Sequence, residues 1–307
     1  MTASHMATAL TPVVAGRRRV ICCHRGQLTG DYPSGSIEAV AECVAARVPR
    51  LEIDVRFLPD DTMLIFHGST LDQETTGSGK VDELDRPHAE ALRYRSDERV
   101  RVAFLEDVVE TLRGSDTLLQ VDLKLMRVIS AARAEILAAT LFPILSHTLI
   151  GSQAHWNLRP LAERGFRVAL DPLMQLYYAP ERDPDRWPSR VGVHGFWDDA
   201  ALAHNRHVGA CDYLDARIDD LAGLLPQATE FMVDIPTVRH MAGLGYPLGE
   251  ELARRGIGLS TWTLRDLGPE ATSEVLAAVF DAGVECVIAD DAAVVGQYAA
   301  GLAGARS

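Results

Sequence analysis

The sequence predicts an α/β fold of the (β/α)8 type, a single-domain TIM barrel, and three observations support this prediction. Short apolar runs rich in β-branched residues alternate with amphipathic stretches along most of the chain. The runs are continuously apolar, which is typical of parallel strands covered by helices on both faces. No linker or low-complexity tract divides the 307 residues, and this length suits one closed barrel.

Nine apolar runs are candidate strands, one more than the barrel needs. We expect the surplus strand to be an extra or edge piece in the region 190–235, where the pattern is poorest. The nine candidates are Val20–Cys23, Leu51–Val55, Met63–Phe66, Leu118–Leu123, Thr148–Gly151, Arg167–Leu170, Phe231–Val233, Gly258–Trp262 and Cys286–Ala289.

Amphipathic stretches between these runs are expected to form the covering helices. Residues 171–212 are rich in Pro, Trp, Tyr and His and have weak periodicity, so we expect a long loop over the barrel mouth that contributes to specificity. Residues 1–16 are expected to be a disordered N-terminal extension or a cloning remnant, which leaves 17–307 as the barrel domain. The helix candidates are Ile37–Arg47, Leu105–Arg113, Ile129–Leu141, Leu158–Arg164, Val238–Arg255 and Pro269–Ala282.

Composition excludes several classes of partner. The formal charge is −13, from 43 acidic and 30 basic residues, and such a surface repels nucleic acid at long range. No run approaches the ~18 apolar residues of a membrane span, and no basic region precedes an apolar one as in a signal peptide. The five cysteines show no CxxC spacing, which predicts buried free thiols in a reducing compartment. We therefore expect a cytoplasmic protein; the sequence leaves its oligomeric state open.

Glu52 and Asp54 provide two carboxylates on one face of an expected strand. Residues at positions i and i+2 of a strand point the same way, so Ile53 faces the opposite side. Inside a barrel the two acids would repel each other and would be costly to desolvate, unless a divalent cation lies between them. Oxygen ligands favour Mg²⁺, with Ca²⁺ as the alternative. A solvated edge strand carrying two surface acids is the competing interpretation.

Asp122 and Lys124 share a face of a later strand in the same way. They could form a simple ion pair. Alternatively, Asp122 is a third metal ligand and Lys124 contacts an anionic oxygen of the substrate. Trp262 ends another expected strand. It could be a core aromatic residue or part of the wall of a substrate pocket.

Two histidines follow strand candidates that flank the paired acids. His24 precedes Arg25 and Gly26, and Gly26 permits a sharp turn out of the strand. His67 ends the run Met63–Phe66 in the same manner. A pair of such histidines favours general acid–base chemistry. On a phosphodiester, one would deprotonate the nucleophile and the other would protonate the leaving alkoxide, while the metal and Arg25 stabilise charge on the other oxygens.

With these pieces in order, the chain resembles the glycerophosphodiester phosphodiesterase family of metal-dependent barrels. As an ordered set the motifs are highly specific, although each alone is weak. They are His24-Arg25-Gly26, the helix entry Pro33–Val40, Leu51-Glu52-Ile53-Asp54-Val55, Phe66-His67, Thr70-Leu71-Asp72 with Gly77-Ser78-Gly79-Lys80, Phe104-Leu105-Glu106-Asp107, Asp122-Leu123-Lys124, Thr261-Trp262-Thr263 and Cys286-Val287-Ile288-Ala289-Asp290.

The resemblance implies a role for each of these side chains. His24 and His67 are the implied acid–base pair. The implied metal ligands are Glu52, Asp54 and Asp122. The implied phosphate contacts are Arg25 and Lys124.

Three positions depart from the family pattern. Ser34 stands where an acidic residue is usual, Asp122 where Glu is usual, and Gly68 where Asp is usual. The last two look like the related phospholipase D toxins, which use an internal substrate hydroxyl and leave a cyclic phosphate, although their characteristic C-terminal motif is absent here.

The sequence therefore predicts a metal-dependent phosphodiesterase that hydrolyses glycerophosphodiesters or similar alkyl phosphodiesters to a phosphomonoester and an alcohol. The expected partner is a small-molecule or lysolipid phosphodiester. The alternatives are a lysophospholipase D or a cyclising phosphodiester lyase and, from another class, a catalytically silent binding barrel.

Overall fold

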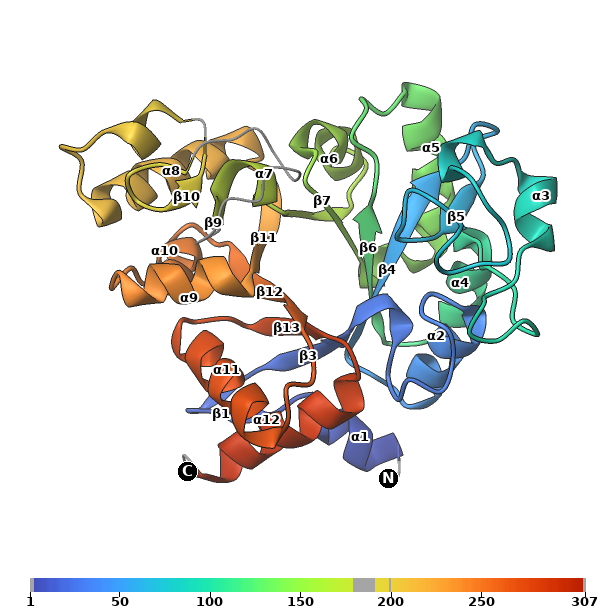
Figure 1. The fold of residues 1–307 in the computed structure, drawn as a ribbon, viewed down its shortest axis with the longest axis horizontal. Coiled ribbons are helices and arrows are strands. Elements are labelled where there is room, and N and C mark those ends of the chain that lie inside the picture. Colours follow the sequence, from blue (N-terminus) through green and yellow to red (C-terminus); the bar gives the residue numbers. More distant parts are fainter. Residues whose placement is uncertain (1–2, 179–190, 199, 306–307) are drawn as a thin grey trace.

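Eight parallel strands close into a barrel in the computed structural model, which describes residues 3–178, 191–198 and 200–305 (Figure 1). Neighbouring strands follow the order β3-β13-β12-β11-β8-β7-β6-β4, and pairing of β3 with β4 closes the ring. The fold class is as predicted. The strands are β3 Val20–Cys23, β4 Arg50–Phe57, β6 Leu118–Leu123, β7 Thr148–Ser152, β8 Arg167–Leu170, β11 Ala228–Asp234, β12 Gly258–Leu264 and β13 Cys286–Ala289.

The ninth strand of the sheet, β5 (Met63–Ile65), is antiparallel to β4 and lies outside the barrel order. The expectation that the surplus strand falls within 190–235 is therefore wrong, because the candidate Phe231–Val233 belongs to the barrel strand β11. β4 extends past its pairing with β6, and a turn through Leu58 brings the chain back as β5. Apolar side chains from residues 58–104 pack into a cluster of their own beside the barrel.

Helices cover the outside of the barrel, and most fall where they are expected (Figure 1). The predicted helix Val238–Arg255 is two helices, because Gly245 adopts a φ of 76° and Pro247 follows it. The covering helices are α2 Ile37–Ala45, α4 Leu105–Leu112, α5 Ala131–Leu141, α6 His155–Ala162, α8 Ala210–Leu224, α9 Ile235–Gly243, α10 Leu248–Arg254, α11 Pro269–Asp281 and α12 Ala292–Ala305. Two shorter helices, α3 Arg86–Ala91 and α7 Leu173–Leu176, lie in the connections.

The segment 171–212 is more ordered than a plain loop where the structure describes it. Strands β9 (Tyr177–Tyr178) and β10 (Phe196–Trp197) form an antiparallel pair. Helix α8 begins inside the segment, and Asp198 fixes this region by accepting hydrogen bonds from Tyr213 Oη (2.7 Å) and Arg217 Nε (2.6 Å). Residues 179–190 and 199 of the predicted loop lie outside the described residues.

The N-terminal residues also differ from expectation. Helix α1 (Ala3–Ala9) packs on α12, and the short strands β1 (Val13–Val14) and β2 (Arg17–Arg18) pair with each other. Leu10 and Val14 are buried in the main core, so residues 3–14 join the fold instead of forming a disordered extension.

All five cysteines are free thiols, and four are buried as expected, whereas Cys211 is exposed. Within the described residues, no helix combines the length and apolar character needed to cross a membrane.

Candidate active site

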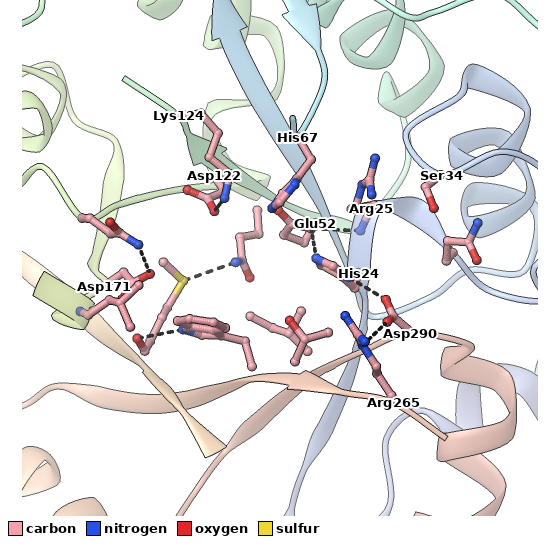
Figure 2. Close-up of a pocket in the computed structure, with 18 of the residues that line it drawn as sticks. His24, Arg25, Ser34, Glu52, His67, Asp122, Lys124, Asp171, Arg265 and Asp290 are labelled. Carbon is pink, nitrogen blue, oxygen red and sulfur yellow. Dashed lines mark hydrogen bonds and ion pairs between the residues drawn. The ribbon is translucent and has the colours of Figure 1, made fainter. Parts of the chain in front are cut away.

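A cavity of about 740 Å³ opens at the carboxyl ends of the barrel strands, where active sites of this fold lie (Figure 2). Among the predicted site residues only Asp54 is not on its surface, because its carboxylate lies buried just beneath. The predicted residues that line the cavity are His24, Arg25, Glu52, His67, Asp122, Lys124 and Trp262.

Three carboxylates meet at the base of this cavity. Glu52 and Asp54 come from β4, and Asp122 lies directly beside Asp54 on β6. One oxygen from each of the three lies within 4.8 Å of the others. Glu52 and Asp54 are only 3% and 2% exposed, which excludes a solvated edge strand. Burial, followed by the charge of Asp54, raises the pKa of Glu52 to about 7.

The donor set fits a hard divalent cation. Both carboxylate oxygens of Asp54 are buried and accept no hydrogen bond in the described part of the chain. Their neighbours are cations instead: Lys124 Nζ at 3.1 Å and Arg25 Nε at 3.5 Å. Burial alone would raise the pKa of Asp54, but Lys124 and the other nearby cations hold it below its ordinary value. Carboxylate oxygens grouped in this way are typical of Mg²⁺ and Ca²⁺ sites.

Lys124 neutralises part of this acidic cluster. Its ammonium lies 2.6 Å from Asp122 and 3.1 Å from Asp54, so the ion pair considered from the sequence is present. Burial would lower the pKa of Lys124, but Asp122 and Asp54 outweigh it and raise the pKa well above its ordinary value. The ammonium therefore remains charged and is part of the cavity wall.

Arg25 is held by a left-handed turn after β3. Its φ is 52° and that of Gly26 is 69°, so the chain leaves the barrel sharply, as the glycine predicts. The Arg25 backbone N–H donates to Glu52 Oε2 at 2.9 Å, and its guanidinium pairs with Asp54 and with Glu74. These contacts fix both the Glu52 carboxylate and a cation at the cavity.

The two histidines reach the cavity by different routes. His24 follows β3 directly, and its Nδ1 lies 2.6 Å from Asp290 Oδ1 while its Nε2 lies 3.8 Å from Glu52. His67 arrives by the antiparallel return of β5, not from a neighbouring parallel strand. The Phe66 N–H donates to the Asp54 carbonyl at 3.1 Å, and this pairing brings His67 next to the carboxylates.

The charges around the histidines shift their pKa values in opposite directions. Burial lowers the pKa of His24, but the hydrogen bond to Asp290 and the charge of Glu52 outweigh burial and raise it overall. Burial lowers the pKa of His67 too, and Lys124 lowers it further, so the opposing effect of Asp54 does not restore it. The surroundings thus shift His24 toward its charged form and His67 toward its neutral form, each relative to an ordinary histidine.

Comparison with known proteins gives the family. The model of the glycerophosphoryl diester phosphodiesterase family matches residues 24–175, which contain both histidines and all three clustered carboxylates. The chain belongs to this family.

Individual relatives of the family are distant. Rat glycerophosphodiester phosphodiesterase 1 is 28% identical over 94 residues, which cover 31% of this chain and 28% of the rat protein. The match therefore spans well under two thirds of that relative. A phosphodiesterase from Oleispira antarctica, solved with the product sn-glycerol-3-phosphate, has a TM-score of 0.61 at 13% identity and covers 97% of this chain and 99% of its own. A glycerophosphodiester phosphodiesterase from Parabacteroides distasonis has a TM-score of 0.62 at 12% identity, covering 93% and 97%. These structures share the fold.

The family pattern gave no role to some of the residues that shape this site, although Asp290 is the last residue of one of its motifs. Asp290 follows β13 and Asp171 follows β8, so both occupy the strand-end position that singled out His24. Burial, and next the charge of Asp122, raise the pKa of Asp171 to about 7. Glu74 comes from the segment beside the barrel, where no periodic pattern marks it.

Trp262 combines both of the roles that the sequence left open. Its indole packs against buried apolar side chains of the barrel interior, including Met232 and Ile288, and Nε1 donates to the Met232 carbonyl at 3.2 Å. Part of the ring still lines the cavity.

Proposed function

We propose that this chain is a divalent-cation-dependent phosphodiesterase that hydrolyses glycerophosphodiesters or similar alkyl phosphodiesters to a phosphomonoester and an alcohol. The observation that supports this most strongly is the grouping of Glu52, Asp54 and Asp122 between His24 and His67 in one cavity. Family membership agrees with it, and so does the product sn-glycerol-3-phosphate in the Oleispira antarctica structure.

Glu52, Asp54 and Asp122 would hold the cation, with Mg²⁺ proposed and Ca²⁺ as the alternative. Such a cation, when bound, neutralises negative charge on a phosphoryl group. Arg25 and Lys124 lie beside the same carboxylates and present positive charge to the cavity. In this proposal they hold the remaining phosphate oxygens and keep the diester fixed between the histidines.

The histidines would move the protons of the reaction. His24 has two carboxylates beside its ring, Asp290 and Glu52, and these neighbours stabilise a protonated imidazole. We assign it the donation of a proton to the leaving alkoxide. His67 would accept a proton from the nucleophile, which is water in the hydrolytic reaction.

A cyclising reaction is the second candidate, in which a hydroxyl of the substrate replaces water as the nucleophile. Asp122 and Gly68, the two positions that look like the phospholipase D toxins, favour it. The third expectation, a silent binding barrel, accounts poorly for a cavity that brings both histidines together with Glu52 and Lys124.

The test is an activity assay on metal-stripped protein with Mg²⁺, Ca²⁺ or Mn²⁺ added back. The substrates would be glycerophosphocholine, glycerophosphoethanolamine, lysophosphatidylcholine and bis-p-nitrophenyl phosphate, with products identified by phosphorus NMR. We expect a metal-dependent linear phosphomonoester. A cyclic phosphate would establish the second candidate instead, and a lack of turnover with every metal and substrate would overturn both.

A further inference from the structure

A second, smaller cavity adjoins the active-site cavity and has a more apolar lining. The smaller cavity, of about 190 Å³, shares three wall residues with the larger one, Leu173, Trp262 and Thr263. The remaining wall of the smaller cavity is formed by Tyr177, Asp234, Ile235 and Pro236. The two cavities therefore lie on adjacent sides of the same residues, at the ends of β8, β11 and β12.

Asp171 lies on the side of the main cavity next to these shared residues. Figure 2 shows it across the cavity from His24 and Arg25. The residue is 8% exposed, and its carboxylate accepts hydrogen bonds from the Leu173 N–H (2.9 Å) and from Gln153 Nε2 (3.4 Å). Both donors are neutral.

Asp171 differs in this respect from the carboxylates of the metal cluster. Asp54 and Asp122 each have Lys124 within 3.1 Å or less, whereas no basic side chain forms an ion pair with Asp171 among the described residues. A buried carboxylate that forms no ion pair is costly to keep ionised. A positively charged ligand group beside it would offset that cost.

The surrounding wall suits a cation that is also bulky and weakly hydrated. The described lining of the smaller cavity contains Asp234 but no lysine, arginine or histidine. Its lining includes the aromatic residues Trp262 and Tyr177 and the aliphatic residue Leu173. Aromatic faces next to a carboxylate are the usual environment for alkylated ammonium groups.

We propose that Asp171, together with the Trp262 and Tyr177 rings, binds an ammonium group carried by the alcohol portion of the substrate. This inference rests on the proposed function, because it takes the phosphate to be held by Arg25 and Lys124 and the ammonium end of the alcohol to lie at Asp171. The preferred substrates are then phosphodiesters of amino alcohols, with a quaternary ammonium favoured over a primary one by the aromatic wall.

The first measurement is binding of choline to the metal-free protein by isothermal titration calorimetry. We expect saturable binding that Asp171→Asn weakens about ten-fold or more, since a charged partner is replaced by a neutral one of the same shape. The matched control is Asp291→Asn, which removes one carboxylate from the other side of the same cavity. Asp291 has a φ of 48°, a conformation that asparagine tolerates well, and this control is expected to change choline affinity less than about two-fold.

The second measurement compares kcat/KM for glycerophosphocholine with kcat/KM for the uncharged analogue glycerophosphoglycerol in the metal-loaded protein. The ratio of the first value to the second should fall about ten-fold in Asp171→Asn, because a general loss of activity would lower both values equally and cancel. Asp291→Asn should leave this ratio unaltered. The effect of Asp171→Asn on kcat/KM for glycerophosphoethanolamine should lie between its effects for the other two substrates. Comparing kcat/KM for lysophosphatidylcholine with that for glycerophosphocholine shows whether the ammonium group is taken from a lipid or from a water-soluble diester.

The outcomes separate the subsite from the proposed function. No choline binding by the wild-type protein, or an equal loss in both variants, would overturn the subsite. An unchanged kcat/KM ratio in Asp171→Asn would do the same. Asp171-dependent choline binding without hydrolysis of any diester would support the subsite as a cation site and overturn the phosphodiesterase proposal.

Discussion

The hydrogen bond between His24 and Asp290 shows how single residues organise this site. At 2.6 Å, the carboxylate fixes the imidazole through Nδ1 and leaves Nε2 toward Glu52 and the cavity. The outer oxygen of Asp290 faces Arg265, at 3.5 Å from its Nε. In the proposed mechanism, Asp290 therefore acts through the orientation of His24.

If His24 and His67 are the proposed acid–base pair, replacing either should remove most of the turnover and leave the fold intact. We expect His24→Ala and His67→Ala each to lower kcat by about 10²–10⁴-fold, the usual contribution of a general acid or base. Neither side chain belongs to the hydrophobic core, so the melting temperature by circular dichroism should change little. Normal turnover by either folded variant would contradict the acid–base assignment.

Asp290→Asn should affect kcat more than KM. The amide keeps the shape of the side chain but no longer stabilises a protonated, correctly oriented His24, and a small misplacement of a catalytic group costs up to about 100-fold. Steady-state kinetics on the metal-loaded protein would measure this. Arg265→Gln, which removes only the outer neighbour of Asp290, is the control and should have a smaller effect. A change confined to KM would show that Asp290 binds substrate instead.

At this scale, the sequence predicted the residues whose spacing has a direct geometric meaning. Glu52 and Asp54 share a strand face by the two-residue repeat, and the structure places them on one site. Asp171 and Asp290 have no such spacing to another site residue, although both follow a strand and Asp290 ends a family motif. Their importance depends on which strand ends meet after the barrel has closed, and that follows from tertiary pairing.

At the scale of elements, the β4–β5 hairpin shows why strand direction is harder to predict than strand position. The run Met63–Phe66 was found correctly, but an apolar run of this length fits a parallel or an antiparallel strand equally well. The turn residues Pro59, Asp60 and Asp61 were the available signal for a hairpin. Asp61 adopts a φ of 66°, and the Thr62 N–H donates to the Asp60 side chain.

The helical part of the fold was predicted where one face is clearly apolar. Helices α8 and α12 were missed: α12 consists mostly of Ala, Gly and Val, which give little contrast between its faces. The division of the region 238–255 into α9 and α10 was also missed, although Gly245 and Pro247 are ordinary signals for a helix end.

Helix α10 packs so closely on the turn before β13 that a single methyl group should disturb it. A Cβ at Gly249 would lie 2.7 Å from the Ala282 carbonyl oxygen and 2.7 Å from Gly283 Cα, and backbone cannot move aside easily. We expect Gly249→Ala to lower the free energy of unfolding by about 1–3 kcal/mol, as overpacking does.

Urea denaturation would measure this loss, with Gly223→Ala in α8 as the matched control. A Cβ at Gly223 meets nothing within 4 Å, so alanine there should be neutral or stabilising by up to about 1 kcal/mol. Equal effects of the two substitutions would contradict the packing argument.

At the scale of the whole molecule, one ion pair joins opposite sides of the barrel. Arg50 on β4 donates to Glu230 on β11, with Nη2 at 2.7 Å from Oε1 and Nη1 at 3.0 Å from Oε2. Arg50 Nε and Nη2 also donate to Gln120 Oε1 on β6. In the ring order, β4 and β11 are four places apart in either direction, so this network spans the interior. Arg50 and Glu230 are 4% and 8% exposed.

Breaking this pair on one side should be costly at neutral pH. Glu230→Gln leaves a buried guanidinium without its counter-charge, and we expect the free energy of unfolding to fall by about 3–5 kcal/mol. The double variant Arg50→Met with Glu230→Gln removes both charges and should recover most of the loss. Equal instability of the single and double variants would show that the apolar packing of these side chains, rather than their charge, stabilises the barrel.

The same pair predicts how the difference between wild type and Glu230→Gln depends on pH. Burial raises the pKa of Glu230, but Arg50 outweighs burial and the folded pKa lies below its ordinary value. The unfolded chain, whose glutamates titrate near about pH 4.3, therefore takes up the proton first as acid is added. The contribution of the pair is complete above that pH and is lost as the pH falls through the folded pKa. Urea denaturation from pH 7 to pH 3 should show the free energies of unfolding of wild type and Glu230→Gln converging below about pH 4. A constant difference between them would mean that Glu230 is not ionised in the folded barrel.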